Sequence, residues 1–365
     1  MRIGILGSGQ LGRMLALAAH PLGHEVVVLG PGADDPAMAV TDAIVAPFDD
    51  VGALAALAAR VDVVTFEFEN VPAASVARLA ARVPVHPPPR ALETGADRLA
   101  EKTLFRRLGI ETAPFAAVDD EASLAAAVAA IGLPGILKTR RLGYDGKGQK
   151  RLRAPADVAG AFAALGGVPA IYEGFVRFER EVSMLGARTA KGEVVLYGPI
   201  ENEHRDGILH VSRSPARGIT EPVRAGARAA ITALLEELSY VGVMAVELFV
   251  AGDRVIANET APRVHNSGHY SIEGAETSQF ENHVRAIAGQ PLGSGEDVGC
   301  TAMINLVGAL PEVGRVLAIE GAHLHLYGKS ERPGRKIGHV TVRARSEAER
   351  EAKIAAVLAL DRWTA

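Results

Sequence analysis

Two glutamates stand on neighbouring strands of a predicted β-hairpin. Glu247 lies in the apolar segment 242–250 and Glu259 ends the segment 254–259, with a short turn between them. A three-residue loop in this turn would place both glutamates on one face, with their Cβ atoms about 5 Å apart. Two carboxylates that close in an apolar setting are unfavourable without a cation. The pair therefore predicts a Mg²⁺ site, unless one side chain points to solvent and the pairing is accidental.

A glycine-rich loop at 143–149 is suited to bind phosphates. The segment 135–139 reads as a strand that ends near Lys138, and three glycines follow in the loop. Such a loop can fold over a polyphosphate and offer backbone N–H groups together with one or two cations. It is not a Walker A motif, because no Gly-Lys-Ser/Thr opens a helix here. The alternative is a flexible hairpin with solvated charges.

A second glycine motif, Gly-Ser-Gly-Gln-Leu-Gly at 7–12, follows the predicted strand 2–6 and opens a predicted helix. Glycines allow a tight turn, and the N-terminus of a helix offers free N–H groups to a phosphate. A dinucleotide-binding fold also requires an acidic residue after the second strand, 25–29, but Gly30 and Pro31 stand there. NAD binding is therefore disfavoured. A purely structural turn and a loop that faces a monophosphate substrate both remain open.

Polar residues gather directly after the hairpin, in a segment that reads as a loop. Arg263, His265, Asn266 and His269 fall within seven residues there. A single histidine in such a place more often makes a structural hydrogen bond, but a cluster directly after a candidate metal ligand favours function. Gly268 argues against a helix that would turn the two histidines into a metal-binding pair.

A compact basic turn lies near the end of the chain, at 329–336. Lys329, Arg335 and Lys336 are suited to grip a phosphate there, arginine as a planar fork and lysine as a point charge. A solvated hairpin is the alternative. One phosphorylated ligand can reach both this turn and the loop 7–12 only if the N- and C-terminal regions face each other across a cleft.

The elements that must position these residues alternate between strands and helices up to about residue 85, which predicts a parallel βαβ array. Prolines between 84 and 89 mark a break. The chain reads as an α/β protein, α+β overall. The predicted strands are 2–6, 25–29, 62–66, 135–139, 150–153, 169–173, 181–188, 194–199, 242–250, 254–259, 300–306, 323–327 and 337–343, and the predicted helices are 10–19, 51–60, 97–108, 122–130, 222–238 and 346–359.

Composition sets the class of protein. A chain of 365 residues with 48% apolar side chains predicts two or three folded domains. The net charge of -4, with both signs mixed, disfavours a nucleic-acid partner. The single Cys300 excludes an internal disulfide and a cysteine-based zinc site. Without an export signal or an apolar run of membrane-spanning length, we expect no membrane partner and a soluble, cytoplasmic protein.

These motifs together resemble the ATP-grasp superfamily and, within it, the N5-carboxyaminoimidazole ribonucleotide synthetases. The resemblance covers nearly the whole chain. It rests on the segments 7–14, 65–71, 143–149, 262–269 and 332–339. The last two are specific to the subfamily, whereas the first is shared with many nucleotide-binding folds.

The resemblance implies an ATP-grasp fold in three parts. These are an N-terminal, Rossmann-like pre-ATP-grasp domain at 1–95, an ATP-grasp domain at 96–290 and a small C-terminal β-rich domain at 291–365. A lid subdomain would lie at about 112–175, and ATP would bind between two β-sheets. The resemblance also implies a homodimer.

The resemblance assigns residues to the nucleotide and the metal. Glu247 and Glu259 would hold Mg²⁺, with Asn258 beside them. Lys147 stands where an arginine is common, which keeps the charge but loses the planar fork. The expected ATP contacts are Arg98, Lys138, Gly143, Tyr144, Asp145, Gly146, Lys147, Gly148, Gln149, Glu173, Gly174, Phe175, Val176, Glu181, His204, Asn258 and Glu259.

The implied reaction is an ATP-dependent carboxylation in purine biosynthesis. Bicarbonate would attack the γ-phosphate of ATP, and the resulting carboxyphosphate would release CO₂ in a closed site. The exocyclic amine of 5-aminoimidazole ribonucleotide would then capture the CO₂ and give N5-carboxyaminoimidazole ribonucleotide. The residues expected around the amine are Glu67, Tyr144, Lys147 and His269, and those expected to bind the rest of the ribonucleotide are Gln10, Arg263, Asn266, Lys329, Arg335 and Lys336.

Three other functions fit parts of the sequence. Another ATP-grasp ligase, such as a glycinamide ribonucleotide transformylase or a biotin carboxylase, is disfavoured by the segment 262–269 and by the basic turn. An NAD-dependent oxidoreductase is disfavoured by Gly30 and Pro31. A catalytically inactive nucleotide sensor is disfavoured because Lys138 and the two hairpin glutamates are retained.

Overall fold

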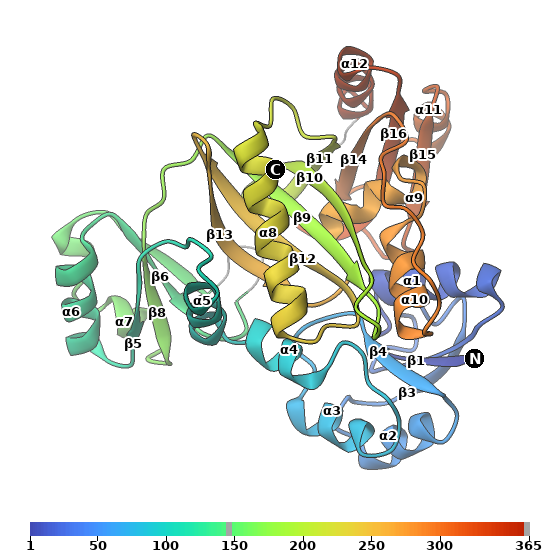
Figure 1. Cartoon of the computed structure of the whole chain (residues 1–365), viewed down its shortest axis with the longest axis horizontal. Helices are drawn as coiled ribbons and strands as arrows, with labels where there is room; N and C mark the ends of the chain where they lie inside the picture. The colour runs from blue at the N-terminus through green and yellow to red at the C-terminus, as the bar shows by residue number, and fades with distance from the viewer. Residues whose placement is uncertain (144–147, 361–365) are drawn as a thin grey trace.

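The computed structural model describes residues 1–143 and 148–360. Its strands form a four-stranded N-terminal sheet, a four-stranded lid sheet and an eight-stranded central sheet. Figure 1 shows the lid set apart on one side of the central sheet, with the N-terminal sheet and the C-terminal elements on the other. The predicted α/β class is confirmed.

The N-terminal sheet is parallel, with the strand order β3-β2-β1-β4. Its apolar strands are covered by helices on both faces, as is usual for a parallel sheet. The edge strand β3 was not predicted, because its four residues are mostly exposed and show no apolar run. The elements of this part are β1 (Arg2–Leu6), α1 (Gln10–Ala19), η1 (His20–Leu22), β2 (Glu25–Gly30), β3 (Asp42–Val45), α2 (Val51–Ala58), β4 (Val63–Phe66), α3 (Ala73–Ala80) and α4 (Pro89–Gly95).

The lid sheet is antiparallel, with the order β5-β8-β6-β7, and has a small apolar core of its own beneath α6. Asp120 caps α6 by accepting a hydrogen bond from the backbone N–H of Ser123 at 2.7 Å. The helix α5 (Arg98–Arg107) leads into the lid. The lid consists of β5 (Phe115–Val118), α6 (Glu121–Ile131), β6 (Gly135–Thr139), β7 (Gln149–Leu152), η2 (Pro155–Asp157), α7 (Ala161–Ala164) and β8 (Ala170–Gly174).

The central sheet has the order β13-β12-β9-β10-β11-β14-β16-β15. It runs without interruption past the predicted boundary at residue 291, because β11 pairs with β14. The strand β11 escaped prediction, since its short segment carries two polar and two basic side chains. The strands are β9 (Arg180–Arg188), β10 (Val194–Arg205), β11 (Ile208–Ser214), β12 (Gly242–Ala251), β13 (Arg254–Ala261), β14 (Cys300–Val307), β15 (Ala322–Leu326) and β16 (Lys336–Ala344).

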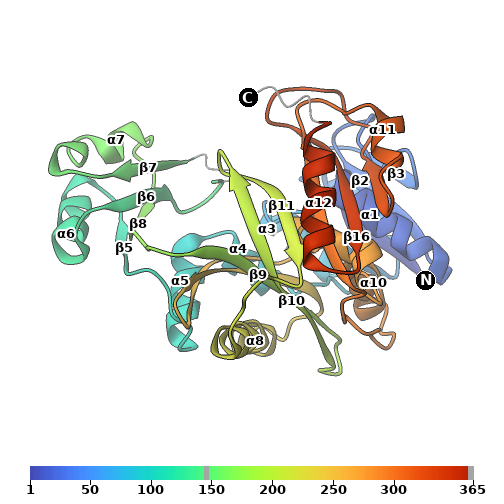
Figure 2. The same cartoon turned by 90° about the horizontal axis from the view of Figure 1, so that it is seen from above.

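Helices cover the central sheet unequally. The long helix α8 packs on one face of β9 and β12, and Figure 2 shows it below the sheet, on the side away from the C-terminal helix. On the other side, α10 packs against α1 of the N-terminal part. These helices are α8 (Glu221–Glu237), η3 (Asn266–Tyr270), α9 (Ser271–Gly274), α10 (Gln279–Ile287), α11 (Val313–Leu317) and α12 (Glu347–Leu358).

The segment after the hairpin differs from its prediction. Residues 266–270 form a 3-10 helix, η3, where a loop was expected. Gly268 is needed there, because a Cβ at this position would lie 2.7 Å from Cδ of Gln279. The glycine that seemed to exclude a helix thus allows a short helix to approach a neighbouring side chain.

Within the described parts of the chain, 1–143 and 148–360, no helix combines the length and the apolar character needed to cross a bilayer.

Candidate active site

The hairpin carboxylates are cross-strand neighbours, as predicted, but the predicted three-residue loop is wrong. The turn of β12 and β13 has two residues, Gly252 and Asp253, and Glu247 pairs with Glu259 because the ladder shifts by one residue next to Glu247. In an unbroken ladder Glu247 would face Asn258, and Glu259 would point to the other side of the sheet. The extra residue is Asn258, so the irregularity itself brings the two carboxylates together.

The carboxylates face away from α8. Val246 and Leu248 belong to the core beneath α8, so Glu247 between them points to the opposite face. There the imidazole of His265 lies against it, with Nε2 3.1 Å from Glu247 Oε1. Burial opposes ionisation of this carboxyl, but the His265 hydrogen bond and nearby positive charge lower its pKa to about 2. Glu247 is therefore ionised throughout the neutral range.

A second carboxylate–imidazole pair lies on the same face. Glu181 of β9 pairs across the sheet with Phe249 of β12, which shares the face of Glu247. Its Oε2 lies 2.6 Å from Nδ1 of His204 on β10. Burial alone would lower the pKa of His204, but the Glu181 carboxylate raises it above the ordinary value. Two residues expected from the resemblance to bind ATP thus meet beside the predicted metal site.

Lys138 and Glu173 form an ion pair inside the lid sheet, with Nζ and Oε2 3.0 Å apart. The side chain of Lys102, from α5, joins them at 3.6 Å and donates to the carbonyl of Ala257 at 3.1 Å. Among the described residues, Oε1 of Glu173 is buried without a hydrogen-bond partner. A buried acceptor in that state is suited to a ligand N–H group.

Arg98, at the start of α5, joins the lid loop to the hairpin. Its Nη1 lies 2.8 Å from Oε2 of Glu259, and its Nη2 donates to the carbonyl of Gly143 at 3.3 Å. The predicted residues Tyr144, Asp145, Gly146 and Lys147 lie outside the described residues. Gly148 and Gln149 follow at the start of β7, and Gly148 has a φ of 69°.

The expected ATP contacts Gly174, Phe175 and Val176 lie at the end of β8 and directly after it. The backbone of this segment is held by Pro134, whose carbonyl accepts from the N–H of Phe175 at 3.0 Å. Phe175 is exposed, and three residues further on Phe178 stacks on Phe249 with ring centroids 4.4 Å apart. Gly174, Phe175 and Val176 therefore form a connection between the lid and the sheet face that carries Glu181 and Glu247.

The N-terminal glycine loop holds a carboxylate from its own chain. Glu67 is buried and accepts hydrogen bonds from the backbone N–H groups of Gly9 at 2.5 Å and Gly12 at 2.6 Å. A Cβ at Gly7 would lie 2.1 Å from Cγ of Glu67. Burial raises the pKa of Glu67, although these hydrogen bonds and nearby cations oppose the rise. The glycines thus make room for Glu67, and two amides that could bind a phosphate are already occupied.

The basic turn of the C-terminal region reaches this loop, which confirms the predicted proximity. Lys329 donates through Nζ to Oε1 of Gln10. Arg335 lies at the exposed end of the turn and donates to Oγ of Ser330 at 2.8 Å. Lys336 begins β16, and its charge acts on Glu247 and His204. Lys329 and Lys336 therefore reach the N-terminal loop and the hairpin carboxylate from the C-terminal side, whereas the side chain of Arg335 is held at the exposed end of the turn.

Arg263 and Asn266, in the segment after the hairpin, are the other two residues predicted to bind the ribonucleotide. The Nε of Arg263 lies 2.6 Å from Oε2 of Glu69. Both polar atoms of the Asn266 side chain, Oδ1 and Nδ2, are buried without a hydrogen-bond partner among residues 1–143 and 148–360. An amide that offers a donor and an acceptor in this way is suited to a polar ligand.

The protonation state of His269 follows from its neighbour. The amide of Gln279 has a fixed orientation, because its Oε1 accepts from the N–H of His265 at 2.8 Å and its Nε2 donates to the carbonyl of His265 at 2.7 Å. The same Nε2 lies 3.3 Å from Nδ1 of His269, which must then accept. Burial lowers the pKa of His269 well below its ordinary value. The neutral ring therefore carries its proton on Nε2 and is a donor there.

Sequence reasoning missed several residues of the site. Lys102, Glu69, Gln279 and Glu101 were not predicted. Glu101 is buried and accepts from both the N–H and the hydroxyl of Thr260. A signal for Glu101 was present, because it lies three residues after Arg98 in a helix and so shares its face. Gln279 is one of three buried polar residues of α10, with Asn282 and His283, and the sequence gives no indication of which partner each one has.

Three family models match the chain. An ATP-grasp domain matches residues 103–280, a ribonucleotide synthetase preATP-grasp domain matches residues 1–95, and a phosphoribosylaminoimidazole carboxylase C-terminal domain matches residues 301–353.

Relatives match over nearly the whole length. An N5-carboxyaminoimidazole ribonucleotide synthase of Pseudomonas aeruginosa is 52% identical over 99% of both chains, and one of Brucella melitensis is 52% identical over 93% of this chain and 95% of its own. The crystal structure of the synthetase from Thermus thermophilus superimposes with a TM-score of 0.96 at 49% identity, over 99% of both chains. A synthase of Aspergillus clavatus in complex with ADP and 5-aminoimidazole ribonucleotide has a TM-score of 0.91 at 32% identity, again over 99% of both chains.

Proposed function

Because this chain belongs to the family of N5-carboxyaminoimidazole ribonucleotide synthases, we propose that its sheet face and its two terminal regions form one site for ATP, bicarbonate and 5-aminoimidazole ribonucleotide. The enzyme is an ATP-grasp ligase of purine biosynthesis, and it carboxylates the exocyclic amine of the ribonucleotide to N5-carboxyaminoimidazole ribonucleotide. The observation that carries the proposal for the site is the contact of Lys329 with Gln10, in a basic turn whose Lys336 also acts on Glu247 of the central sheet.

The ATP half of the site lies between the lid and the central sheet. The adenine would lie against Glu173 and Val176. Oε1 of Glu173, which has no hydrogen-bond partner among the described residues, is suited to accept from the adenine amino group. Glu181 and His204 would bind the ribose side of the nucleotide. The phosphates would lie between Lys138, Arg98 and the loop 143–149. The same loop would close over them and exclude water.

The metal half rests on the donor chemistry of the hairpin. Glu247 and Glu259 are cross-strand neighbours on one face, and carboxylate oxygens are the ligands that Mg²⁺ prefers. Each carboxylate has a partner: the imidazole of His265 lies against Glu247, and the guanidinium of Arg98 lies against Glu259. Glu247 and Glu259 would hold Mg²⁺, which would supply positive charge against the negative charge that develops on the phosphates.

The acceptor half lies between the N-terminal loop, η3 and the basic turn. The phosphate of the ribonucleotide would be bound mainly by Lys329, Arg335 and Lys336, because Glu67 occupies two amides of the glycine loop. Gln10, Arg263 and the buried amide of Asn266 would contact the rest of the ribonucleotide. Glu67, Tyr144, Lys147 and His269 would surround the amine.

The proposed chemistry proceeds in three balanced steps. An oxygen of bicarbonate forms a bond to the γ-phosphorus while the bond to the β–γ bridging oxygen breaks, which gives carboxyphosphate and ADP. The C–O bond to phosphate then breaks and releases CO₂ and inorganic phosphate. The amine nitrogen forms a bond to the carbon of CO₂ and loses one proton, which the departing phosphate can accept. The site supplies position and charge, as phosphoryl transfer requires.

The larger assembly also forms part of this proposal. We propose a cytoplasmic homodimer, whose protomer divides into domains at 1–95, 96–290 and 291–365, with the lid at about 112–175. The family-model matches to 1–95, 103–280 and 301–353 support this division.

The direct test measures three quantities in one assay: ADP released, inorganic phosphate released and labelled bicarbonate incorporated. We expect ATP turnover that depends on 5-aminoimidazole ribonucleotide, and one labelled carbon in the product for each ATP consumed. Glycinamide ribonucleotide with formate is the control, and it should give no turnover. Turnover with that pair, or ATP hydrolysis that does not respond to the aminoimidazole substrate, would overturn the proposal.

A further inference from the structure

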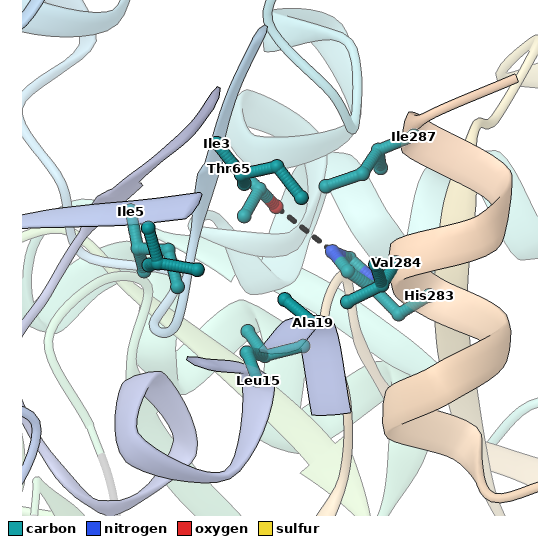
Figure 3. A pocket seen from close by; sticks show the side chains of 9 residues that line it. Ile3, Ile5, Leu15, Ala19, Thr65, His283, Val284 and Ile287 are labelled. Atoms are coloured by element: carbon teal, nitrogen blue, oxygen red, sulfur yellow. Dashed lines mark hydrogen bonds between the residues drawn. The ribbon is translucent and has the colours of Figure 1, made fainter. Parts of the chain in front are cut away.

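A buried histidine joins the N-terminal sheet to the central sheet. His283 of α10 is fully buried, with Nε2 2.9 Å from Oγ1 of Thr65 on β4 and Nδ1 3.1 Å from the backbone nitrogen of Val243 on β12. Figure 3 shows the ring pointing from α10 towards Thr65, between the side chains of α1 and β1. One side chain thus contacts strands of two different sheets.

The roles of the two ring nitrogens are fixed. The backbone N–H of Val243 can only donate, so Nδ1 of His283 accepts. Burial lowers the pKa of His283 to about 3, so the ring is neutral at physiological pH. Its proton therefore lies on Nε2 and is donated to the hydroxyl of Thr65.

The surroundings hold the ring in this place. The space beside it has no room for a water molecule. The apolar side chains that line this space are those of Ile3, Ile5, Leu15, Ala19, Val26, Val284 and Ile287. Gly242 has a φ of 114°, and a Cβ there would lie 2.9 Å from Cε1 of the imidazole. With the ring in place, water therefore cannot compete for either hydrogen bond.

Both contacts lie close to the site in sequence. Thr65 precedes Glu67 by two residues, and Val243 precedes Glu247 by four residues on the strand that carries it. From this juxtaposition we propose that His283 is a positioning residue, which sets the acceptor half of the site against the metal half. The inference deepens the proposed function and rests on it.

Correct spacing matters because CO₂ must travel from the ATP side to the amine before it escapes. If the two halves shift, ATP is still cleaved but less CO₂ is captured. The characteristic effect of losing His283 is therefore uncoupling, in which more than one ATP is consumed for each ribonucleotide carboxylated. A residue that only stabilises the fold would lower the melting temperature without changing this ratio.

Two conservative variants address the hydrogen bond itself. Thr65→Val removes the acceptor at constant volume, and His283→Asn keeps an acceptor near Val243 but cannot reach Thr65. We expect each to raise the ATP-to-product ratio well above one and to slow carboxylation roughly 10- to 100-fold, as misplacements of about 1 Å do, with KM for ATP unchanged. The double variant should be no worse than either single variant, because both remove one bond.

Tyr197→Phe is the matched control. The Tyr197 hydroxyl donates to the carbonyl of Thr277 and accepts from Asn282, which lies on α10 beside His283. This hydroxyl does not join the two sheets. This variant should lose stability and stay coupled. Uncoupling of equal size in the control, or full coupling in a folded His283→Phe variant, would overturn the inference.

A spectroscopic arm separates this inference from the proposed function. In ¹⁵N-histidine-labelled enzyme without ligands, the resonances lost in His283→Phe should be those of a neutral ring protonated on Nε2. A ring protonated on Nδ1 would overturn the inference even in an active enzyme. If the wild type shows the ring protonated on Nε2 but fails to carboxylate the ribonucleotide, the proposed function is contradicted instead.

Discussion

The glycine motif of the N-terminal loop shows how one residue type can serve different ends. Three glycines after a strand would ordinarily indicate a phosphate at the helix N-terminus. Here they accommodate the carboxylate of Glu67, which lies under the loop and accepts two of its N–H groups. Sequence patterns do not separate these cases, because an internal carboxylate and an external phosphate need the same freed amides.

Glu259 is the first residue whose substitution tests the site. Glu259→Gln should abolish ATP turnover and leave the fold intact, because a neutral amide coordinates Mg²⁺ poorly. Turnover and circular dichroism are measured together. Glu111→Gln, which removes the partner of Arg254 at the other end of the hairpin, is the control and should remain active. Near wild-type turnover in Glu259→Gln would refute the metal assignment.

Arg335 tests the phosphate site. Arg335→Ala should raise KM for the ribonucleotide roughly 10- to 100-fold, on the ~1.5–3 kcal/mol scale of a charged hydrogen bond. KM for ATP should change little. Arg315→Ala removes an exposed arginine of the same region, on α11, and should change neither constant. An equal effect of Arg335→Ala on both substrates, or no effect, contradicts the placement.

His269 tests the donor assignment. Because Gln279 leaves the ring proton on Nε2, His269→Gln keeps an N–H donor near the same place and should retain most activity. His269→Leu should lose roughly 100-fold in kcat, the usual cost of one donor in a reacting site. The pH–rate profile of the wild type should have no rising or falling limb that is missing from the profiles of the two variants. If both variants are equally inactive and such a limb disappears, His269 acts as a base.

At the scale of elements, strands with long apolar runs were predicted well, and short or polar strands were not. The hairpin of β12 and β13 was found from its apolar segment and the short turn after it, and the pairing of its glutamates followed from that hairpin. The predicted pairing was right but the predicted loop length was wrong. The sequence gives no sign that the extra residue lies in the ladder, at Asn258, instead of in the turn. Likewise, η3 was missed because its form depends on Gln279, a side chain from another helix.

The contact of α5 with β13 predicts a pH dependence of stability. Burial raises the pKa of Glu101 to about 7, so the folded protein holds a proton that the unfolded chain releases near pH 4.5. Stability from this site is therefore complete below pH 4.5 and is lost as pH rises towards 7. The full effect is roughly 3 kcal/mol, because one pKa unit corresponds to about 1.4 kcal/mol.

Glu101→Gln isolates this effect. Both hydrogen bonds from Thr260 end on Oε1, which an amide oxygen can replace. In denaturant titrations the variant should match wild type at pH 4.5 and be more stable at pH 8. Parallel pH profiles of the two proteins would show that Glu101 does not titrate in this range.

At the scale of the molecule, the continuous central sheet predicts which parts unfold together. Strands on both sides of residue 291 belong to one sheet, whereas the described strands of the lid pair only with one another. In native-state hydrogen exchange, β9–β12 and β14–β16 should open as one unit and the lid as another. Added ATP should protect the lid most. Independent exchange of β14–β16 would contradict this.

The contact between Gln10 and Lys329 also has a consequence for the synthesis of the chain on the ribosome. The two residues are 319 positions apart, so at ~5–20 residues per second the partner of Gln10 is made roughly 15–60 s later. During most of translation, the loop of the N-terminal sheet therefore lacks its contact with Lys329. Glu67 is made early, however, and already satisfies two amides of that loop. The buried carboxylate thus shields the nascent domain until the last region of the chain arrives to close the site.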